Sequence, residues 1–208
     1  MFTGLVQATG AIVEVTKLQS GVRIAIDAKG LAPRRIAVGD SIAVNGVCLT
    51  ATEVQGMLFH ADVSLETLSK TTGLDRRELV NLEAALALGD ALGGHLLAGH
   101  VDGVGTISGL APVGESVELV VDAPRALAPY LAPKGSVAVD GVSLTVNRVR
   151  DLGAQADGAC EISINLIPHT IEVTTFRTRA VGAKVNLEAD LIARYVVRAL
   201  EARSPDLE

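Results

Sequence analysis

Two short stretches of the chain carry the residue types best suited to covalent or proton-transfer chemistry. The first reads N-G-V-C-L-T at 45–50, and the second reads D-G-V-S-L-T at 140–145; we call them the first and second cassette. Cys48 and Ser143 occupy the same place in the two cassettes, 95 residues apart. A thiol and a hydroxyl can each act as a nucleophile when a neighbouring group activates them. We therefore expect function to depend on this difference between two otherwise equal positions.

Histidines at the start of the second copy add proton transfer to the available chemistry. Histidine gains and loses a proton near neutral pH, so His100 could serve as an acid or a base. Each residue also has an ordinary structural interpretation: Cys48 could be a small buried hydrophobe, and the hydroxyls of Ser143 and Thr145 could bond a strand edge. The spacing of His95 and His100 does not match the helical H-E-x-x-H motif, and no carboxylate lies at a helical offset, so we predict no metal site.

The cassettes belong to a repeat that covers almost the whole chain. The segment G-L-V-Q-A-T-G-A-I at 4–12 corresponds to G-H-V-D-G-V-G-T-I at 99–107, and V-N-L-E occurs at both 80–83 and 185–188. A solenoid needs at least three short units, whereas here there are two long ones. The repeat therefore predicts two homologous domains.

The domain boundaries follow from the repeat. We expect a first barrel at 1–94, a second barrel at 95–189, and a C-terminal helix with a tail at 190–208. The offset between matching residues grows from 95 to 105 along the chain, which predicts loop insertions in the second copy near 150–159 and 179–182.

Within each copy the pattern is that of short strands separated by Gly-containing turns. In the first copy we expect strands at 11–15, 22–26, 41–44, 47–54, 57–63 and 80–82. About six short strands at this spacing are typical of a small closed antiparallel barrel. Ser64 can cap one helical turn that ends at Leu68. At 76–79 the first copy lacks the Val-Gly turn of the second, so we expect a shorter loop there, away from the cassettes.

A C-terminal helix at 190–203 has no counterpart in the first copy. Its apolar residues recur at helical spacing: Leu191, Ile192, Tyr195, Val196, Ala199 and Leu200. Such a stripe must be covered by the barrel of its own chain or by another subunit. The sequence leaves both options open.

Composition excludes several classes of protein. The net charge is −6 and no basic cluster occurs, which argues against nucleic-acid binding and against a polybasic membrane surface. No apolar run approaches the roughly 18 to 20 residues of a membrane helix, and the first residues have no basic flank of the signal-peptide kind. The two cysteines lie at non-equivalent positions, which suits reduced thiols. We therefore expect a cytoplasmic protein without membrane or nucleic-acid partners.

Five motifs in register give the chain a family resemblance. They are M-F-T-G-L-V at 1–6, the two cassettes, G-G-H-L-L-A-G-H-V-D-G at 93–103, and L-I-P-H-T at 166–170. Together they resemble riboflavin synthase of the alpha-chain type, from residue 1 to about 203. The resemblance implies an all-β fold of two homologous six-stranded Greek-key barrels in tandem plus a C-terminal α-helix.

The resemblance also implies an activity and an assembly. Two molecules of 6,7-dimethyl-8-ribityllumazine would give riboflavin and 5-amino-6-ribitylaminouracil by transfer of a four-carbon unit, with no metal or external cofactor. The family forms homotrimers, with each site between the first barrel of one subunit and the second barrel of a neighbour. Association with lumazine synthase is a further partner interaction to consider. Two similar pockets suit a reaction whose two substrates are the same molecule.

Candidate site residues follow from the resemblance and the repeat. The candidate catalytic residues are Cys48, His100, Ser143 and Asp190. We expect one pocket to be lined by Gly4, Leu5, Val6, Cys48, Leu49, Thr50, Asp62, Val63, Ser64, Leu65, Glu66 and Thr67. We expect the other to be lined by Gly99, His100, Val101, Lys134, Ser143, Leu144, Thr145, Asn165, Leu166, Ile167, Pro168, His169 and Thr170. Asp140 is a further candidate, although Asp-Gly is also an ordinary turn signal.

The expected mechanism begins with removal of a proton from the 7-methyl group of one lumazine. His100 or Ser143 would manage that proton, and Cys48 or water would add to the second lumazine. Three alternatives remain: a non-catalytic lumazine- or flavin-binding protein of the same fold, a flavin reductase, and a purely structural tandem barrel. A flavin reductase would need a nicotinamide-binding domain, and no G-x-G-x-x-G followed by a helix occurs.

Overall fold

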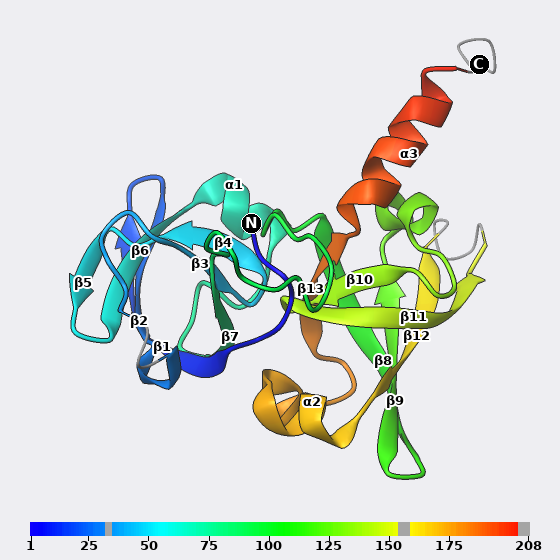
Figure 1. Ribbon diagram of the computed structural model, residues 1–208, viewed down its shortest axis with the longest axis horizontal. Helices are drawn as coiled ribbons and strands as arrows, with labels where there is room; N and C mark the ends of the chain where they lie inside the picture. Colours follow the sequence, from blue (N-terminus) through cyan, green and yellow to red (C-terminus); the bar gives the residue numbers. More distant parts are fainter. Residues whose placement is uncertain (32–34, 154–158, 204–208) are drawn as a thin grey trace.

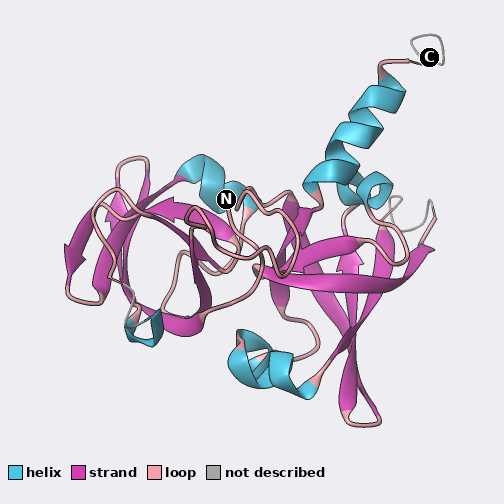
Figure 2. Cartoon of the chain, in the orientation of Figure 1, coloured by secondary structure: helices cyan, strands magenta, loops and turns pink. Residues whose placement is uncertain are grey.

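The computed structural model describes residues 1–31, 35–153 and 159–203, and consists of two β-barrels and one protruding helix (Figure 1). Strands make up most of both barrels, and the helices among them are short (Figure 2). Part of the insertion expected near 150–159, namely 154–158, and the tail 204–208 lie outside the described residues. The two-barrel prediction is confirmed.

The first barrel is built from antiparallel strands in the order β4-β3-β7-β1-β2-β6-β5. Their bounds are β1 Ala8–Leu18, β2 Gly21–Asp27, β3 Ser41–Val44, β4 Val47–Thr50, β5 Glu53–Gln55, β6 Leu58–Ser64 and β7 Leu79–Ala84. The strand expected over 47–54 is broken at Thr52, whose N–H and hydroxyl both donate to the carbonyl of His60. Because β4 and β5 are consecutive in the chain, the two ends of the sheet are joined covalently and together fill one strand position.

The second barrel closes completely, in the order β10-β11-β12-β9-β8-β13. Its strands are β8 Gly103–Val113, β9 Ser116–Ala123, β10 Ser136–Val139, β11 Val142–Asp151, β12 Cys160–Leu166 and β13 Lys184–Ala189. Here β11 is continuous and pairs with both β10 and β12. It therefore takes the place that β4 and β5 share in the first barrel.

Each barrel has its own apolar core. Ile24, Ile26 and Phe59 are fully buried in the first, and Ile107 and Ile162 are fully buried in the second. Burying such a side chain stabilises the fold by about 1.5 to 3 kcal/mol. Alternation along a strand turns successive side chains to opposite faces, so the residues on either side of each reactive side chain point into a core.

Short helices connect the strands. They are η1 Lys29–Leu31, α1 Leu65–Lys70, η2 Arg125–Tyr130, α2 Pro168–Val173 and η4 Thr175–Thr178. The predicted cap of α1 is confirmed, since the Ser64 hydroxyl accepts the N–H of Thr67 at 3.1 Å. By the repeat, α1 and α2 occupy equivalent places in the two barrels.

The chain segments that lead into the two barrels are exchanged between them. We call residues 2–7 the first opening segment and residues 97–102 the second. They cross at an antiparallel bridge, where Phe2 and Leu97 exchange N–H···O bonds of 2.8 and 3.1 Å. Beyond the bridge, Val6 packs against the core of the second barrel and Val101 against that of the first. Each opening segment therefore lies on the barrel of the other repeat.

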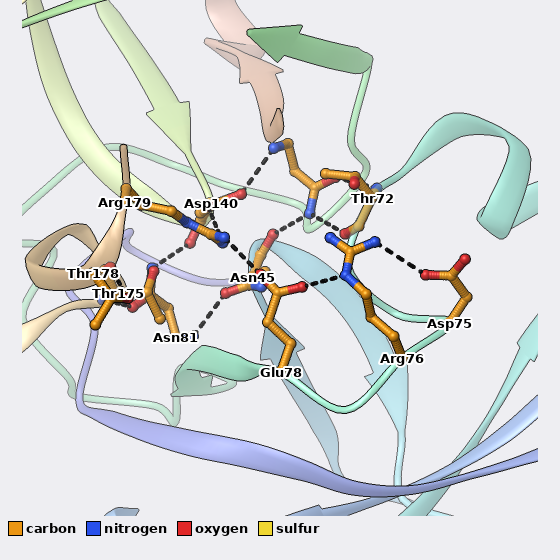
Figure 3. A network of polar contacts seen from close by, with 11 residues as sticks. Asn45, Thr72, Asp75, Arg76, Glu78, Asn81, Asp140, Thr175, Thr178 and Arg179 are labelled. Carbon is orange, nitrogen blue, oxygen red and sulfur yellow. Dashed lines mark hydrogen bonds and ion pairs between the residues drawn. The ribbon is translucent and has the colours of Figure 1, made fainter. Parts of the chain in front are cut away.

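A buried polar network holds the two cassette turns together (Figure 3). The side-chain amide of Asn81 donates to the Asp140 carbonyl at 2.9 Å, and that of Asn186 donates to the Asn45 carbonyl at 3.0 Å. The N–H groups of the same two asparagines donate back to the side chains of Asn45 and Asp140, both at 2.8 Å. Equivalent residues of the two repeats thus make reciprocal bonds, which indicates an approximate twofold axis between the barrels.

One ion cluster breaks this symmetry. Arg179 pairs with Asp140 at 2.7 Å and with Glu78 at 2.5 Å (Figure 3). Our expectation that the 76–79 loop lies away from the cassettes is therefore wrong, because Glu78 in that loop shares an arginine with the second cassette. The buried carboxyl of Asp140 attracts Arg179 inward, whereas the equivalent Arg76 pairs with Glu78 and Asp75 and remains half exposed.

The C-terminal helix, α3 Leu191–Glu201, projects from the second barrel (Figure 1). It touches η2, and Arg194 pairs with Asp102 at 2.7 Å, but none of its residues is buried. Four large apolar side chains of its stripe are 51% to 67% exposed, namely Ile192, Tyr195, Val196 and Leu200, and Leu191 is half-buried. Of the two options for covering this stripe, packing on its own barrel is thus not observed. No helix in the described ranges has the length and apolar character needed to cross a membrane.

Candidate functional site

Cys48 lies in a cavity formed by the first barrel and the second opening segment. The cavity has a volume of about 210 Å³ and is lined by Val47, Cys48, Glu66, Thr67, Lys70, Thr71, Gly99, His100 and Val101. The side chains of Cys48 and Thr50 point away from the core, because Val47 and Leu49 point into it. Ligand pockets are commonly about 300 to 1,000 Å³, so this cavity is smaller than a typical ligand pocket.

Gly99 brings the second opening segment against Cys48. The Cys48 N–H donates to the Gly99 carbonyl at 2.9 Å. Gly99 has φ of +77°, and a Cβ there would lie 2.6 Å from the Cβ of Cys48. Only glycine tolerates both this conformation and this approach. The close contact places His100, the next residue, at the edge of the Cys48 pocket.

The surroundings of Ser143 are equivalent, because here the first opening segment lies against the second barrel. Its N–H donates to the Gly4 carbonyl at 2.8 Å. Gly4 has φ of +75°, and a Cβ there would lie 2.6 Å from the Cβ of Ser143. The backbone around the hydroxyl thus matches the backbone around the thiol.

His95 makes the two sites chemically different. Its Nδ1 lies 2.7 Å from the Ser143 hydroxyl oxygen, and its Nε2 is buried without a hydrogen-bond partner in the part of the chain described. Burial lowers the pKa of His95, and the charge of Asp190 opposes that change. A neutral imidazole can accept the Ser143 proton at Nδ1 and then carries its own proton on Nε2. Ser143 is therefore paired with a base.

The structure combines the predicted pocket residues differently from our expectation. We expected Gly4 to share a pocket with Cys48, and His100 to share one with Ser143. Instead, Gly4 contacts Ser143 and His100 lies beside Cys48. The reason is the crossing of the opening segments at Phe2, which exchanges them between barrels.

Other predicted residues have structural roles. Leu49, Val63 and Leu166 are buried in the two cores, so their side chains do not line an open pocket. Asp62 is paired with Arg23 on the surface at 2.7 Å.

Two more candidates lie at the ends of elements. Asp190 caps α3 by accepting the N–H of Ile192 at 2.9 Å, and its charge acts on His95. Lys134 lies in an exposed turn with φ of +68°, and its N–H donates to the Val146 carbonyl at 2.7 Å.

The candidates on the two short helices divide between lining and exposed residues. Glu66 and Thr67 of α1 line the Cys48 pocket, and the side chain of Ser64 is used as the helix cap. In the second barrel Asn165 is exposed, as are the residues at the start of α2: Ile167, Pro168 and His169. Thr170 is half-buried, and its carbonyl accepts the Thr174 hydroxyl.

His95 is a candidate that sequence reasoning missed. We weighed it only as a metal ligand, because the repeat places its counterpart before residue 1 and so gives no comparison. The G-G-H sequence next to the second opening segment was the available signal. Among the described residues, no group of three or more His, Cys, Asp or Glu side chains could hold a metal ion.

Both repeats match a known family model. The lumazine binding domain model matches residues 3–85 and again 98–190. The riboflavin synthase of Mycobacterium tuberculosis (strain ATCC 25618 / H37Rv) is 44% identical over 207 residues, which cover 97% of this chain and 99% of that protein.

Two solved structures of LumP, each with a different ligand, share the fold of this chain. LumP complexed with riboflavin matches with a TM-score of 0.75 and 25% identity, covering 91% of this chain and 99% of that one. LumP complexed with 6,7-dimethyl-8-(1'-D-ribityl) lumazine matches with a TM-score of 0.74 over the same shares, at 23% identity, which indicates the fold alone. Since curated full-length relatives are named riboflavin synthase, a non-catalytic binding protein is not favoured. The chain belongs to the riboflavin synthase family, with two lumazine binding domains in tandem.

Proposed function

We propose that the chain converts two molecules of 6,7-dimethyl-8-ribityllumazine into riboflavin and 5-amino-6-ribitylaminouracil. The observation that carries this proposal is a pair of equivalent backbone cradles with unequal reactive groups, Cys48 in one and the Ser143–His95 pair in the other. Equivalent cradles suit two copies of one substrate. Unequal groups suit a transfer in which one copy loses four carbons and the other gains them. Two lumazines contain all the atoms of the two products, so no oxidant or reductant is consumed.

In this proposal Ser143 and His95 handle the proton at the second barrel. His95 Nδ1 accepts the Ser143 proton, and the activated oxygen removes a proton from the 7-methyl group of the bound lumazine. The resulting carbanion delocalises into the ring, where backbone N–H groups stabilise negative charge. The lumazine at the first barrel lies beside Cys48 and His100. The thiol adds reversibly across a C=N bond of that ring while its proton passes through His100 to the ring nitrogen, and the C–S bond breaks again, with return of the proton to sulfur, as the new carbon–carbon bond forms.

We further propose that each complete site forms between two subunits of a homotrimer. The helices α1 and α2, which occupy equivalent places beside the two barrels, lie at opposite edges of the molecule in Figure 1. Two rings bound to one chain would therefore face away from each other, whereas four-carbon transfer requires them face to face. The exposed stripe of α3 supports a contact between subunits.

We also propose domain boundaries, a cellular location and a partner enzyme. The units are 1–94 and 95–189 for the barrels, with 190–208 for the helix and tail. A cytoplasmic location and association with lumazine synthase complete the proposal, and co-elution of the two proteins would test the association.

Turnover of a single substrate tests the reaction. The purified chain is incubated with 6,7-dimethyl-8-ribityllumazine alone, in the presence of a metal chelator, and both products are quantified. We expect one riboflavin and one pyrimidine for every two lumazines consumed. Tight binding of the lumazine without turnover would instead identify a non-catalytic binding protein.

A further inference from the structure

Two buried glutamates occupy equivalent positions in the last strands of the barrels. Glu83 of β7 is 4% exposed and Glu188 of β13 is 5% exposed. In the described part of the chain neither forms an ion pair, and burial raises the pKa of both carboxyls, although backbone N–H groups oppose the rise. A buried carboxylate without a cation is costly unless its oxygens are hydrogen-bonded. Both carboxylates therefore need hydrogen-bond donors from nearby groups.

Each glutamate accepts two successive backbone N–H groups of an opening segment. Glu83 accepts those of Thr3 and Gly4 at 2.7 and 2.9 Å. Glu188 accepts those of Ala98 and Gly99 at 2.8 and 3.1 Å. The two N–H groups go to different oxygens of the carboxylate, and Glu83 Oε1 also accepts the Thr3 hydroxyl at 2.7 Å. The pair of backbone contacts therefore requires two acceptor atoms on one side chain. An uncharged amide cannot provide them, because one of its two ends is a donor.

The glycine that each glutamate holds also touches a reactive residue of the other barrel. The Gly99 carbonyl accepts the Cys48 N–H, and the Gly4 carbonyl accepts the Ser143 N–H. Glu188 of the second barrel is thus connected through one residue to the thiol of the first. By the same route, Glu83 of the first barrel is connected to the hydroxyl of the second.

We propose that Glu188 and Glu83 are positioning residues, each of which holds an opening segment against the reactive residue of the other barrel. Glu188 maintains the Cys48 pocket together with His100, and Glu83 maintains the surroundings of Ser143. The consequence for catalysis rests on the proposed function. The structural part does not, because the accessibility of Cys48 can be measured without turnover.

The test compares Glu188→Gln with Glu83→Gln. Both variants make the same chemical change at equivalent buried positions, but only the first frees the segment that covers Cys48. We expect alkylation of Cys48 by iodoacetamide to become about tenfold faster in Glu188→Gln, since losing one hydrogen bond to a charged acceptor eases local opening by roughly that factor. In Glu83→Gln the rate stays at the wild-type value. The wholly buried Cys160 reports global unfolding in every sample.

Catalysis provides the second measurement. Both variants should lower kcat in the lumazine assay. Glu188→Asp keeps two acceptor oxygens on a shorter side chain, so its kcat should lie between those of Glu188→Gln and the wild type. An unchanged Cys48 rate in Glu188→Gln, or an equal increase in Glu83→Gln, would overturn the proposal, because the glutamates would then only stabilise the fold. If Glu188→Gln does not fold, Glu188→Asp and Glu83→Asp make the same comparison. A wild-type chain without turnover would contradict the proposed function but not the alkylation result.

Discussion

At the scale of residues, the two reactive side chains differ most in their partners. Ser143 has the imidazole of His95 at 2.7 Å, whereas no described residue hydrogen-bonds the thiol of Cys48. A hydroxyl needs a base to become reactive, but a thiol needs less help because it ionises more readily. The difference between hydroxyl and thiol is therefore matched by a difference in their surroundings.

We predict that Ser143 and His95 act as one unit. Ser143→Ala and His95→Gln should each lower kcat by roughly 10², with little change in riboflavin affinity, because proton transfer contributes to the rate more than to binding. The double variant should lose no more than either single one. Steady-state kinetics and fluorescence titration provide the two readouts, and His60→Gln, on β6, is the control. Additive losses would show that the two residues act separately.

A related prediction concerns Cys48 and His100 at the first barrel. Cys48→Ser retains a nucleophilic atom of lower reactivity, so kcat should fall by less than in Ser143→Ala. His100→Gln should lose roughly 10² if it transfers a proton. Wild-type kcat in both variants would contradict the roles given to this pocket.

Asp140 links stability to pH. Burial raises its pKa from 3.8 to about 6, against the opposing charge of Arg179. The folded chain therefore binds this proton more tightly than the unfolded chain does, and the contribution to stability is present below pH 4 and lost as pH rises through 6. Its size is roughly 2 to 3 kcal/mol. Asp140→Asn, which copies the native Asn45 of the first turn, should remove this part of the pH dependence.

Urea unfolding of the wild type and Asp140→Asn at several pH values between 4 and 7 measures this effect. Other buried carboxyls, such as Glu83 and Glu188, contribute equally to both proteins and cancel in the difference. Parallel stability curves would contradict a raised pKa for Asp140.

At the scale of elements, local patterns predicted what local interactions determine. The alternation in the cassettes, the cap at Ser64 and the helix after Asp190 each depend on neighbours in sequence. The exchange of the opening segments was not predictable in this way. Because the two barrels are homologous, an opening segment can pair with equivalent residues in the same register on either barrel. The repeat therefore cannot tell whether each segment lies on its own barrel or on the other one. The pairing of His95 with Ser143 likewise joins residues 48 positions apart, and the break at Thr52 depends on its bonds to His60 of the next long strand.

The exposed stripe of α3 leads to a prediction about assembly. Replacing Ile192 and Val196 by Gln should abolish the trimer, since burying each side chain would contribute about 1.5 to 3 kcal/mol. Light scattering gives the mass, and Arg198→Gln on the polar side is the matched control. A trimer that persists in the double variant would show that α3 does not hold the subunits together.

At the scale of the whole molecule, an approximate twofold axis relates the two barrels. The turns of the cassettes meet at this axis through Asn45, Asp140 and their asparagine partners, so both sites are attached to one rigid centre. In the proposed function, each chain contributes two half-sites that do not meet each other. A head-to-tail contact between copies, closed into a ring, would bring unlike half-sites together.

Mixing two inactive variants tests this account most directly. His100→Gln disables the Cys48 half-site and Ser143→Ala disables the other half-site. After equal amounts are unfolded together and refolded, random assembly should restore about a quarter of wild-type turnover, because one interface in four would combine two intact half-sites. Turnover in the mixture that stays at the average of the two separate variants would contradict the account, since each site would then lie within one chain.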